Sequence, residues 1–145
     1  MDPDSYGLSH AAITVPLMST LARGTFDVEI TPGSPELDGD ISRFELIKSF
    51  HGDLEGSGTG VMLSGGSPQS GSAGYVAIEV VHGRLGEREG GFALQQFGIM
   101  HDGTQTLHYE VVPGSGQGDL AGISGVFNLT IEDDGTHRFE LDYDL

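Results

Sequence analysis

Residues 50–63 read FHGDLEGSGTGVML, and residues 109–127 read YEVVPGSGQGDLAGISGVF. Both stretches contain Gly-Asp-Leu-x-Gly, beginning at Gly52 and at Gly118, 66 positions apart, and both lead into a strand-like segment. Glycine at such a place permits the backbone torsions of a sharp strand-entry bend. We therefore predict two equivalent corners of one sheet, with Leu54 and Leu120 pointing into its apolar interior.

Eight segments of the chain show alternating apolar and polar residues or β-rich composition between turn-forming residues. They lie near residues 22–31, 41–51, 54–64, 73–84, 92–101, 105–113, 123–132 and 137–144. The pairs Asp102-Gly103 and Asp134-Gly135 indicate hairpin turns, because both residue types tolerate a positive φ. Eight strands in up-and-down order can close on themselves and leave no unpaired edge. The sequence predicts an all-β fold, a closed antiparallel eight-stranded β-barrel, and a sandwich is the competing arrangement.

The chain length and the position of the strand-like segments indicate one domain. A chain of 145 residues is long enough for a single core. We place the barrel domain at residues 22–145. Residues 1–21 offer only a poor helix candidate, interrupted by Pro16, and are interpreted as a flexible, partly disordered N-terminal arm.

The charge and composition exclude several classes of partner. With 22 acidic residues against 6 Lys and Arg, the formal net charge is −16, which repels nucleic acid and acidic lipid surfaces. No apolar run reaches the roughly 18 residues of a membrane span. The first 21 residues carry no Lys or Arg, whereas a secretory signal begins with a positively charged segment. The chain also has no cysteine and so no disulfide. We therefore expect a cytoplasmic protein with no nucleic-acid or membrane partner.

Residues 71–100, GSAGYVAIEVVHGRLGEREGGFALQQFGIM, residues 107–125, LHYEVVPGSGQGDLAGISG, and the ending FELDYDL carry a family resemblance. They resemble a bacterial family of domains of unknown function whose solved members adopt the allene oxide cyclase-like eight-stranded barrel. The resemblance implies an antiparallel barrel with a ligand-sized mouth. Where the family pattern has Leu-Gln-His-Phe, this chain has Leu94-Gln95-Gln96-Phe97, so any role of that histidine is absent here.

Polar residues in step with large apolar ones are the candidates for a site inside the barrel. Glu79 lies on one face of its strand with Tyr75 and is our first choice for a general acid or base, since burial among apolar neighbours would raise its pKa. Lys48 is the only lysine of the chain and shares a face with aromatic residues. His108 and Glu110 are two residues apart on one strand and form a candidate acid–base pair.

The other candidates are expected to bind a ligand. They are Tyr75, Gln95, Gln96, Met100 and Tyr143, together with Lys48. Strand alternation allows only one of Gln95 and Gln96 to face inward. The histidines lie scattered at strand ends without a recognised metal-ligand spacing, so we expect no metal and no other cofactor.

The sequence leaves two classes of function open. The first is a barrel that encloses a small, largely apolar organic molecule and isomerises or cyclises it by confinement and acid–base catalysis. The alternative is a non-catalytic carrier, or a structural oligomeric barrel with no active site. Segment 75–82 has apolar residues on both faces, which predicts a homo-oligomer under either hypothesis.

Overall fold

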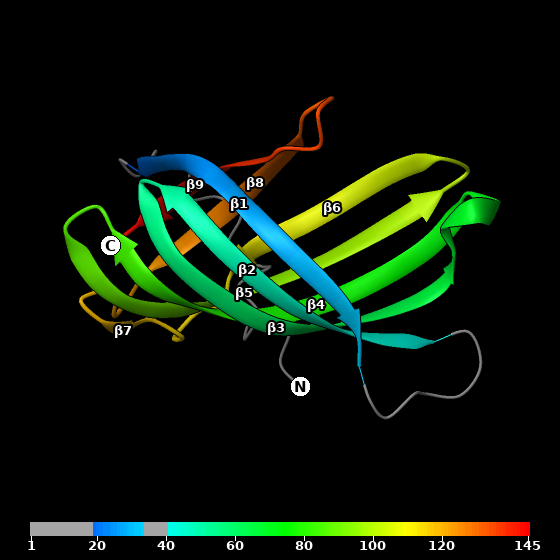
Figure 1. Cartoon of the computed structure of the whole chain (residues 1–145). Helices are drawn as coiled ribbons and strands as arrows, with labels where there is room; N and C mark the ends of the chain where they lie inside the picture. The colour runs from blue at the N-terminus through cyan, green and yellow to red at the C-terminus, as the bar shows by residue number, and fades with distance from the viewer. Residues whose placement is uncertain (1–18, 34–40) are drawn as a thin grey trace, which may run out of the picture.

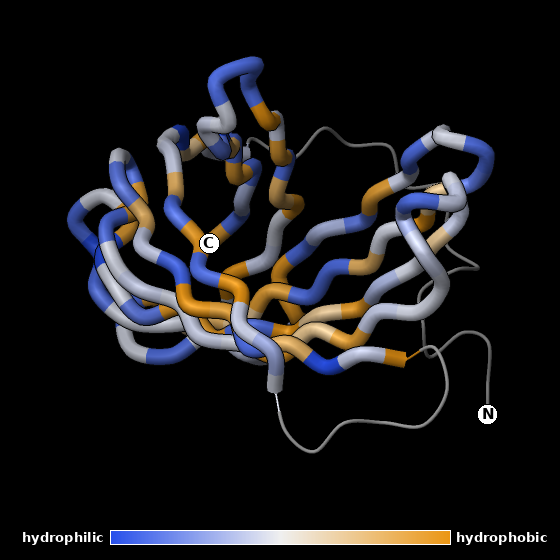
Figure 2. Tube along the Cα trace, turned by 45° about the vertical axis from the view of Figure 1, so that its right-hand side comes forward, coloured by the Kyte–Doolittle hydropathy of each residue, from blue (hydrophilic) through white to orange (hydrophobic). Residues whose placement is uncertain are grey.

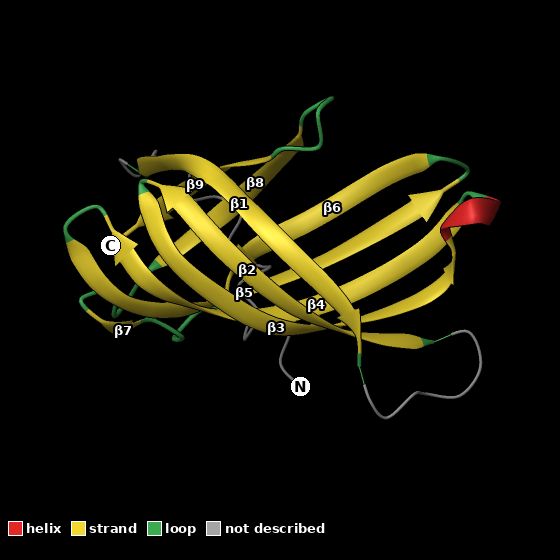
Figure 3. Ribbon diagram, viewed as in Figure 1, coloured by secondary structure: helices red, strands yellow, loops and turns green. Residues whose placement is uncertain are grey.

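The computed structural model describes residues 19–33 and 41–145, and strands make up most of them (Figures 1 and 3). Within the described part of the chain, one 3₁₀ turn, η2 (Pro68–Ser70), joins two of the strands (Figure 3). The strands are β1 (Thr20–Pro32), β2 (Ser42–Gly52), β3 (Leu54–Ser67), β4 (Ser72–Leu85), β5 (Arg88–His101), β6 (Thr104–Val111), β7 (Gln117–Gly118), β8 (Ser124–Ile131) and β9 (His137–Asp144). The eight long strands fall on the eight predicted segments to within a few residues.

The eight long strands form a closed barrel, as predicted. Each pairs antiparallel with the next one along the chain, except that β6 pairs with β8 because β7 is a two-residue strand beside β5. The barrel is closed by β1 and β9, whose register runs from Thr20↔Tyr143 to Phe26↔His137. The competing sandwich is thereby excluded. Among the long strands, β6 and β8 have the shortest pairing, with the single residue pair Glu110↔Val126.

The barrel domain begins slightly earlier than the sequence suggested. Strand β1 starts at Thr20, and Thr20 and Leu21 already pair with β9, although both were assigned to the N-terminal arm. The rest of that predicted arm, up to residue 18, lies outside the described residues.

The two Gly-Asp-Leu runs form equivalent corners, which confirms the prediction made from their repetition. Gly52 and Gly118 have φ of 116° and 64°, and Leu54 and Leu120 are fully buried. At the first corner the Asp53 N–H donates to the carbonyl of Arg23 (2.9 Å), while the Asp53 carboxylate accepts from the Arg23 N–H (2.8 Å). Asp119 makes the same two bonds to Glu89, at 2.9 and 3.3 Å. Each aspartate therefore holds both backbone groups of one residue on the neighbouring strand.

Strand β3 turns three glycines toward the barrel interior, and these leave room for larger side chains. Gly56, Gly58 and Gly60 alternate with outward residues and lie opposite Gly83, Val81 and Glu79 of β4. A Cβ on Gly58 would come within 3.2 Å of the Phe50 ring. A Cβ on Gly60 would lie 2.7 Å from the Cβ of Glu79 and 2.4 Å from the Ile78 carbonyl oxygen. The glycines thus permit close strand approach and supply interior volume.

The barrel interior is packed at one end and hollow at the other. The packed end holds an apolar cluster that includes the rings of Phe26, Phe50, Phe92, Phe127 and Phe139. This end contains the β2–β3 and β4–β5 turns, whereas the β3–β4 and β5–β6 hairpins lie at the opposite end, on the right in Figure 1. Orange and blue segments alternate along the strands in Figure 2, as expected where successive side chains face opposite sides of a sheet.

We expect Gly60→Ala to destabilise the protein by about 1–3 kcal/mol, because its methyl group overlaps β4 and pushes against Glu79. Gly65→Ala on the same strand is the matched control, since a Cβ there meets nothing within 4 Å. Urea unfolding of both variants measures the difference in the free energy of unfolding. Equal stability of the two variants would contradict the proposed role of the β3 glycines.

Candidate functional site

Three polar side chains meet inside the barrel, just above the aromatic cluster. Lys48 on β2 and Glu79 on β4 form an ion pair, with Nζ 2.8 Å from Oε2. The Lys48 ammonium donates to the Tyr109 hydroxyl at 2.8 Å, and this hydroxyl donates to Oε1 of Glu79 at 2.8 Å. The three groups thus form a closed ring of contacts, which we call the buried polar layer. Lys48 is 4% exposed, Glu79 1% and Tyr109 4%.

The surroundings of the buried polar layer are aromatic and apolar. The Lys48 ammonium lies 4.7 Å from the centre of the Phe26 ring, a cation–π arrangement. Glu79 lies opposite Gly60, where a larger residue would take its space. A charge buried in such a setting needs an opposite charge beside it, so removing either Lys48 or Glu79 leaves the other charge uncompensated. Glu79 is therefore not the isolated carboxylate that the sequence suggested, since Lys48 neutralises it.

A second polar pair lies closer to the open end. The Tyr75 hydroxyl on β4 donates to Oε1 of Gln96 on β5 at 2.9 Å. Gln96 is 8% exposed, and its strand neighbour Gln95 is exposed on the outside. The inward-facing glutamine is therefore Gln96, in agreement with the prediction that only one of the two could face the interior. Tyr75 is half-buried and also borders the hollow above it.

The open end of the barrel contains a cavity of about 850 Å³. Its apolar lining includes Phe44, Met62, Met100, Leu107, Leu129 and Ile131. Its polar lining consists of Ser42, Ser64, Tyr75, Gln105 and Thr106, and no charged side chain lines it among the described residues. The volume falls within the range of small-molecule sites, and the lining suits a neutral, mostly apolar guest.

The structure separates the sequence-predicted residues into three groups. Tyr75 and Met100 line the cavity, whereas Lys48, Glu79 and Gln96 are buried below it. Gln95, His108 and Glu110 lie on the outer face, where the imidazole of His108 stacks on the Phe97 ring at 4.5 Å. Tyr143 packs against the apolar cluster near the β1–β9 junction, away from the cavity.

These positions correct two expectations. His108 and Glu110 cannot form an interior acid–base pair, because Tyr109 between them is the inward residue of β6. Gln95 and Tyr143 do not border the cavity. Most of the cavity wall was not named from the sequence. Phe44 and Leu107 could have been found by extending the alternation that places Lys48 and Tyr109 inside.

Burial and the nearby Glu79 charge alter the acidity of both interior tyrosines. Burial first, and then the negative charge of Glu79, raise the pKa of Tyr75 above its usual value of 10.0. The pKa of Tyr109 is raised well above that value, by burial first and then by the charge of Glu79 and the hydrogen bond to it. Both hydroxyls therefore keep their protons at neutral pH.

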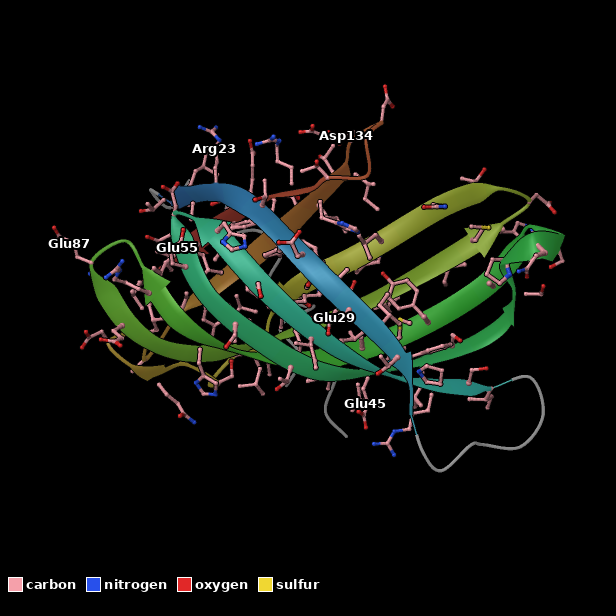
Figure 4. The ribbon with its side chains drawn as sticks, viewed as in Figure 1. Arg23, Glu29, Glu45, Glu55, Glu87 and Asp134 are labelled. Carbon is pink, nitrogen blue, oxygen red and sulfur yellow. The ribbon has the colours of Figure 1, made fainter. Side chains whose placement is uncertain are left out.

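Most of the acidic charge lies outside the barrel. Glu29, Glu45, Glu55 and Glu87 extend from the outer surface in Figure 4. Among the described residues, no group of three or more His, Asp or Glu side chains is arranged to hold a metal ion. None of the described segments forms a helix that is long and apolar enough to cross a membrane.

The fold and its interior define an up-and-down β-barrel with a ligand-sized cavity above a buried ion pair. Residues 22–143 match the family described as "Protein of unknown function (DUF3224)", and the chain belongs to this family. Its fold is similar to the crystal structure of a DUF3224 protein of unknown function from Shewanella oneidensis MR-1, with a TM-score of 0.79 and 45% identity. The match covers 88% of this chain and 97% of that one. No curated protein matches the chain.

Glu79→Gln should lower the free energy of unfolding by about 3–5 kcal/mol, because it leaves the Lys48 ammonium buried without a counter-charge. The double variant Lys48→Met/Glu79→Gln should recover much of this loss, since no uncompensated charge remains. Urea unfolding of the wild type, Lys48→Met, Glu79→Gln and the double variant completes a double-mutant cycle, which measures the interaction free energy of the two groups. Single variants that are each as stable as the wild type would contradict the mutual dependence of the two groups.

The free energy of unfolding should fall as the pH rises above 10. A pKa raised in the folded state means that the native protein holds the proton more tightly than the unfolded chain. This contribution to stability is complete below the unfolded pKa of about 10 and is lost at higher pH. Tyr109→Phe removes the group, so its stability should fall less steeply between about pH 10 and 11.5. Parallel pH profiles for the wild type and this variant would contradict the assignment.

Proposed function

We propose that the barrel binds a small, neutral, largely apolar organic molecule in the cavity at its open end. The observation that carries this proposal is the cavity of about 850 Å³, whose lining is mostly apolar and contains no charged residue among those described. A hollow of this kind next to a packed core is the usual setting of a ligand site. The DUF3224 family itself is described only as of unknown function.

Charge and hydrogen bonding narrow the class of ligand. The protein carries a formal net charge of −16, and its lysine is already paired with Glu79, so the cavity offers no cation to an anionic ligand. A single polar group on the ligand could reach the Tyr75 hydroxyl, which already bonds Gln96. No carboxylate lines the cavity among the described residues, so a cationic ligand would find no partner there either. The ligand class is therefore an uncharged molecule with one hydroxyl, carbonyl or aromatic amine group.

An isomerisation or cyclisation in the same cavity is the second candidate function. It is favoured by the Tyr75 hydroxyl, a proton donor and acceptor at the cavity wall whose pKa responds to Glu79. In such a reaction Tyr75 would contact the reacting molecule. Glu79, bound by Lys48 and Tyr109, would be a positioning residue behind it, and confinement would supply most of the rate.

The neutral fluorophore N-phenyl-1-naphthylamine is a suitable probe for the cavity. We expect its fluorescence to increase on binding to the wild type, and expect Leu129→Trp to weaken binding about tenfold or more by filling the cavity. Thr130→Trp is the matched control, because the adjacent residue of β8 is exposed outside and should leave binding unchanged. The anionic relative 1-anilinonaphthalene-8-sulfonate should bind about tenfold more weakly than the neutral probe.

Two outcomes would contradict the binding proposal. One is the absence of any saturable fluorescence change with the wild type. The other is equal weakening of binding by Leu129→Trp and Thr130→Trp, which would place the probe on the outer surface.

A further inference from the structure

An apolar patch covers the outer surface of β3, β4 and β5. It consists of Val61, Val76, Ile78, Val80, Phe97 and Ile99, whose side chains are between 38% and 55% exposed. The strand register makes the patch continuous, since Val61 lies opposite Ile78 and Val76 lies opposite Phe97. We call this surface the outer apolar face. Exposed apolar residues that gather in this way mark an interaction surface more often than a free one.

The outer apolar face is also free of charge, in a protein that is strongly acidic overall. In segments 57–65, 74–81 and 91–100, which form this part of the sheet, the only charged residue is Glu79, and it points inward. The charged groups begin at the rim, where Glu45 of β2 lies opposite Val61 and Glu110 of β6 lies opposite Gln95. A partner recognised by ion pairs would find no counter-charge within the face itself.

We propose that the outer apolar face binds the same face of a second copy of this chain. A hollow of about 330 Å³ lies on it, lined in part by Val61, Val76 and Phe97. A two-fold axis parallel to β4 places β5 of one copy over β3 of the other. Because Leu63 and Phe97 are both in register with Val76, the Phe97 ring of each copy then covers the side of the hollow formed by Leu63 on the other copy. The face can therefore pair with itself, as a two-fold dimer requires.

The size of the face determines how strong such a dimer can be. Three strands about 4.8 Å apart and about six residues of about 3.3 Å each give a face of roughly 15 by 20 Å. With a rim of neighbouring side chains, two such faces bury on the order of 1,000 Å², near the lower limit of specific interfaces. Interfaces of this size are typical of weak or transient complexes, so the test covers dissociation constants of about 1–100 µM.

The net charge gives this dimer a distinctive salt dependence. Two copies with a formal charge of −16 each repel one another, while the contact between them is apolar. Salt screens the repulsion and leaves the apolar contact intact. Raising NaCl from about 0.05 M to about 0.5 M strengthens the dimer several-fold, whereas docking through ion pairs would weaken over the same range.

Sedimentation velocity on the full chain, from about 1 to 300 µM, tests the proposal over the affinity range of such an interface. The wild type shifts from monomer to dimer as concentration rises, and shifts further at high salt. Ile78→Lys places a charge at the centre of the face and keeps the protein monomeric. Val126→Lys is the matched control, because Val126 is 50% exposed on the outer surface of β8, away from the face, and it dimerises as the wild type does.

Circular dichroism and urea unfolding show that Ile78→Lys is folded, and neither measurement depends on the cavity proposal. A wild type that stays monomeric at about 300 µM in high salt overturns the proposal. The same result is expected if a different protein covers the face. Dissociation of the dimer by salt overturns the proposal as well. So does equal loss of the dimer in Ile78→Lys and Val126→Lys.

Discussion

The ion pair between Lys48 and Glu79, completed by Tyr109, determines how the inside of this barrel is divided. Burying either charge alone costs several kcal/mol. The side chains of Lys48, Glu79 and Tyr109, which come from β2, β4 and β6, must therefore lie at one level of the barrel interior. The glycines of β3 are what make this possible, because a Cβ at Gly60 would occupy the space of Glu79. Below this level the interior is filled by phenylalanine rings, and above it the interior is hollow.

This division relates the structure to a function. The buried polar layer lies below the hollow region without lining it, and the Tyr75–Gln96 pair provides a hydrogen-bonding group at the cavity wall. The interior charges neutralise each other, so a neutral guest meets only apolar walls and a few uncharged polar groups. The outer surface uses the same strands differently, since β4 places Glu79 inside and Ile78 and Val80 outside. One strand can in this way serve an interior ligand site and an exterior contact.

The sequence was sufficient for the fold because its strongest signals are local. Positive φ at Gly52 and Gly118, and the burial of Leu54 and Leu120, follow from the repeated Gly-Asp-Leu corner. Alternation also places Glu79 on one face of its strand with Tyr75, and it allows only one of Gln95 and Gln96 to face inward, as the structure has it. The contacts within the site could not be predicted in this way, because Lys48, Glu79 and Tyr109 are brought level by the stagger of the closed barrel. Alternation also left the inner face of β6 undecided, and there Tyr109 is buried while His108 and Glu110 are exposed.

The existence of a binding cavity above the buried polar layer can be tested most directly through methionine methyl groups. Met62 and Met100 both line the cavity, from β3 and β5. In protein labelled with ¹³C at the methionine methyl groups, and assigned by Met62→Leu and Met100→Leu, both signals should shift saturably as N-phenyl-1-naphthylamine is added. Binding of the probe without movement of either signal, or no binding at all, would contradict the account.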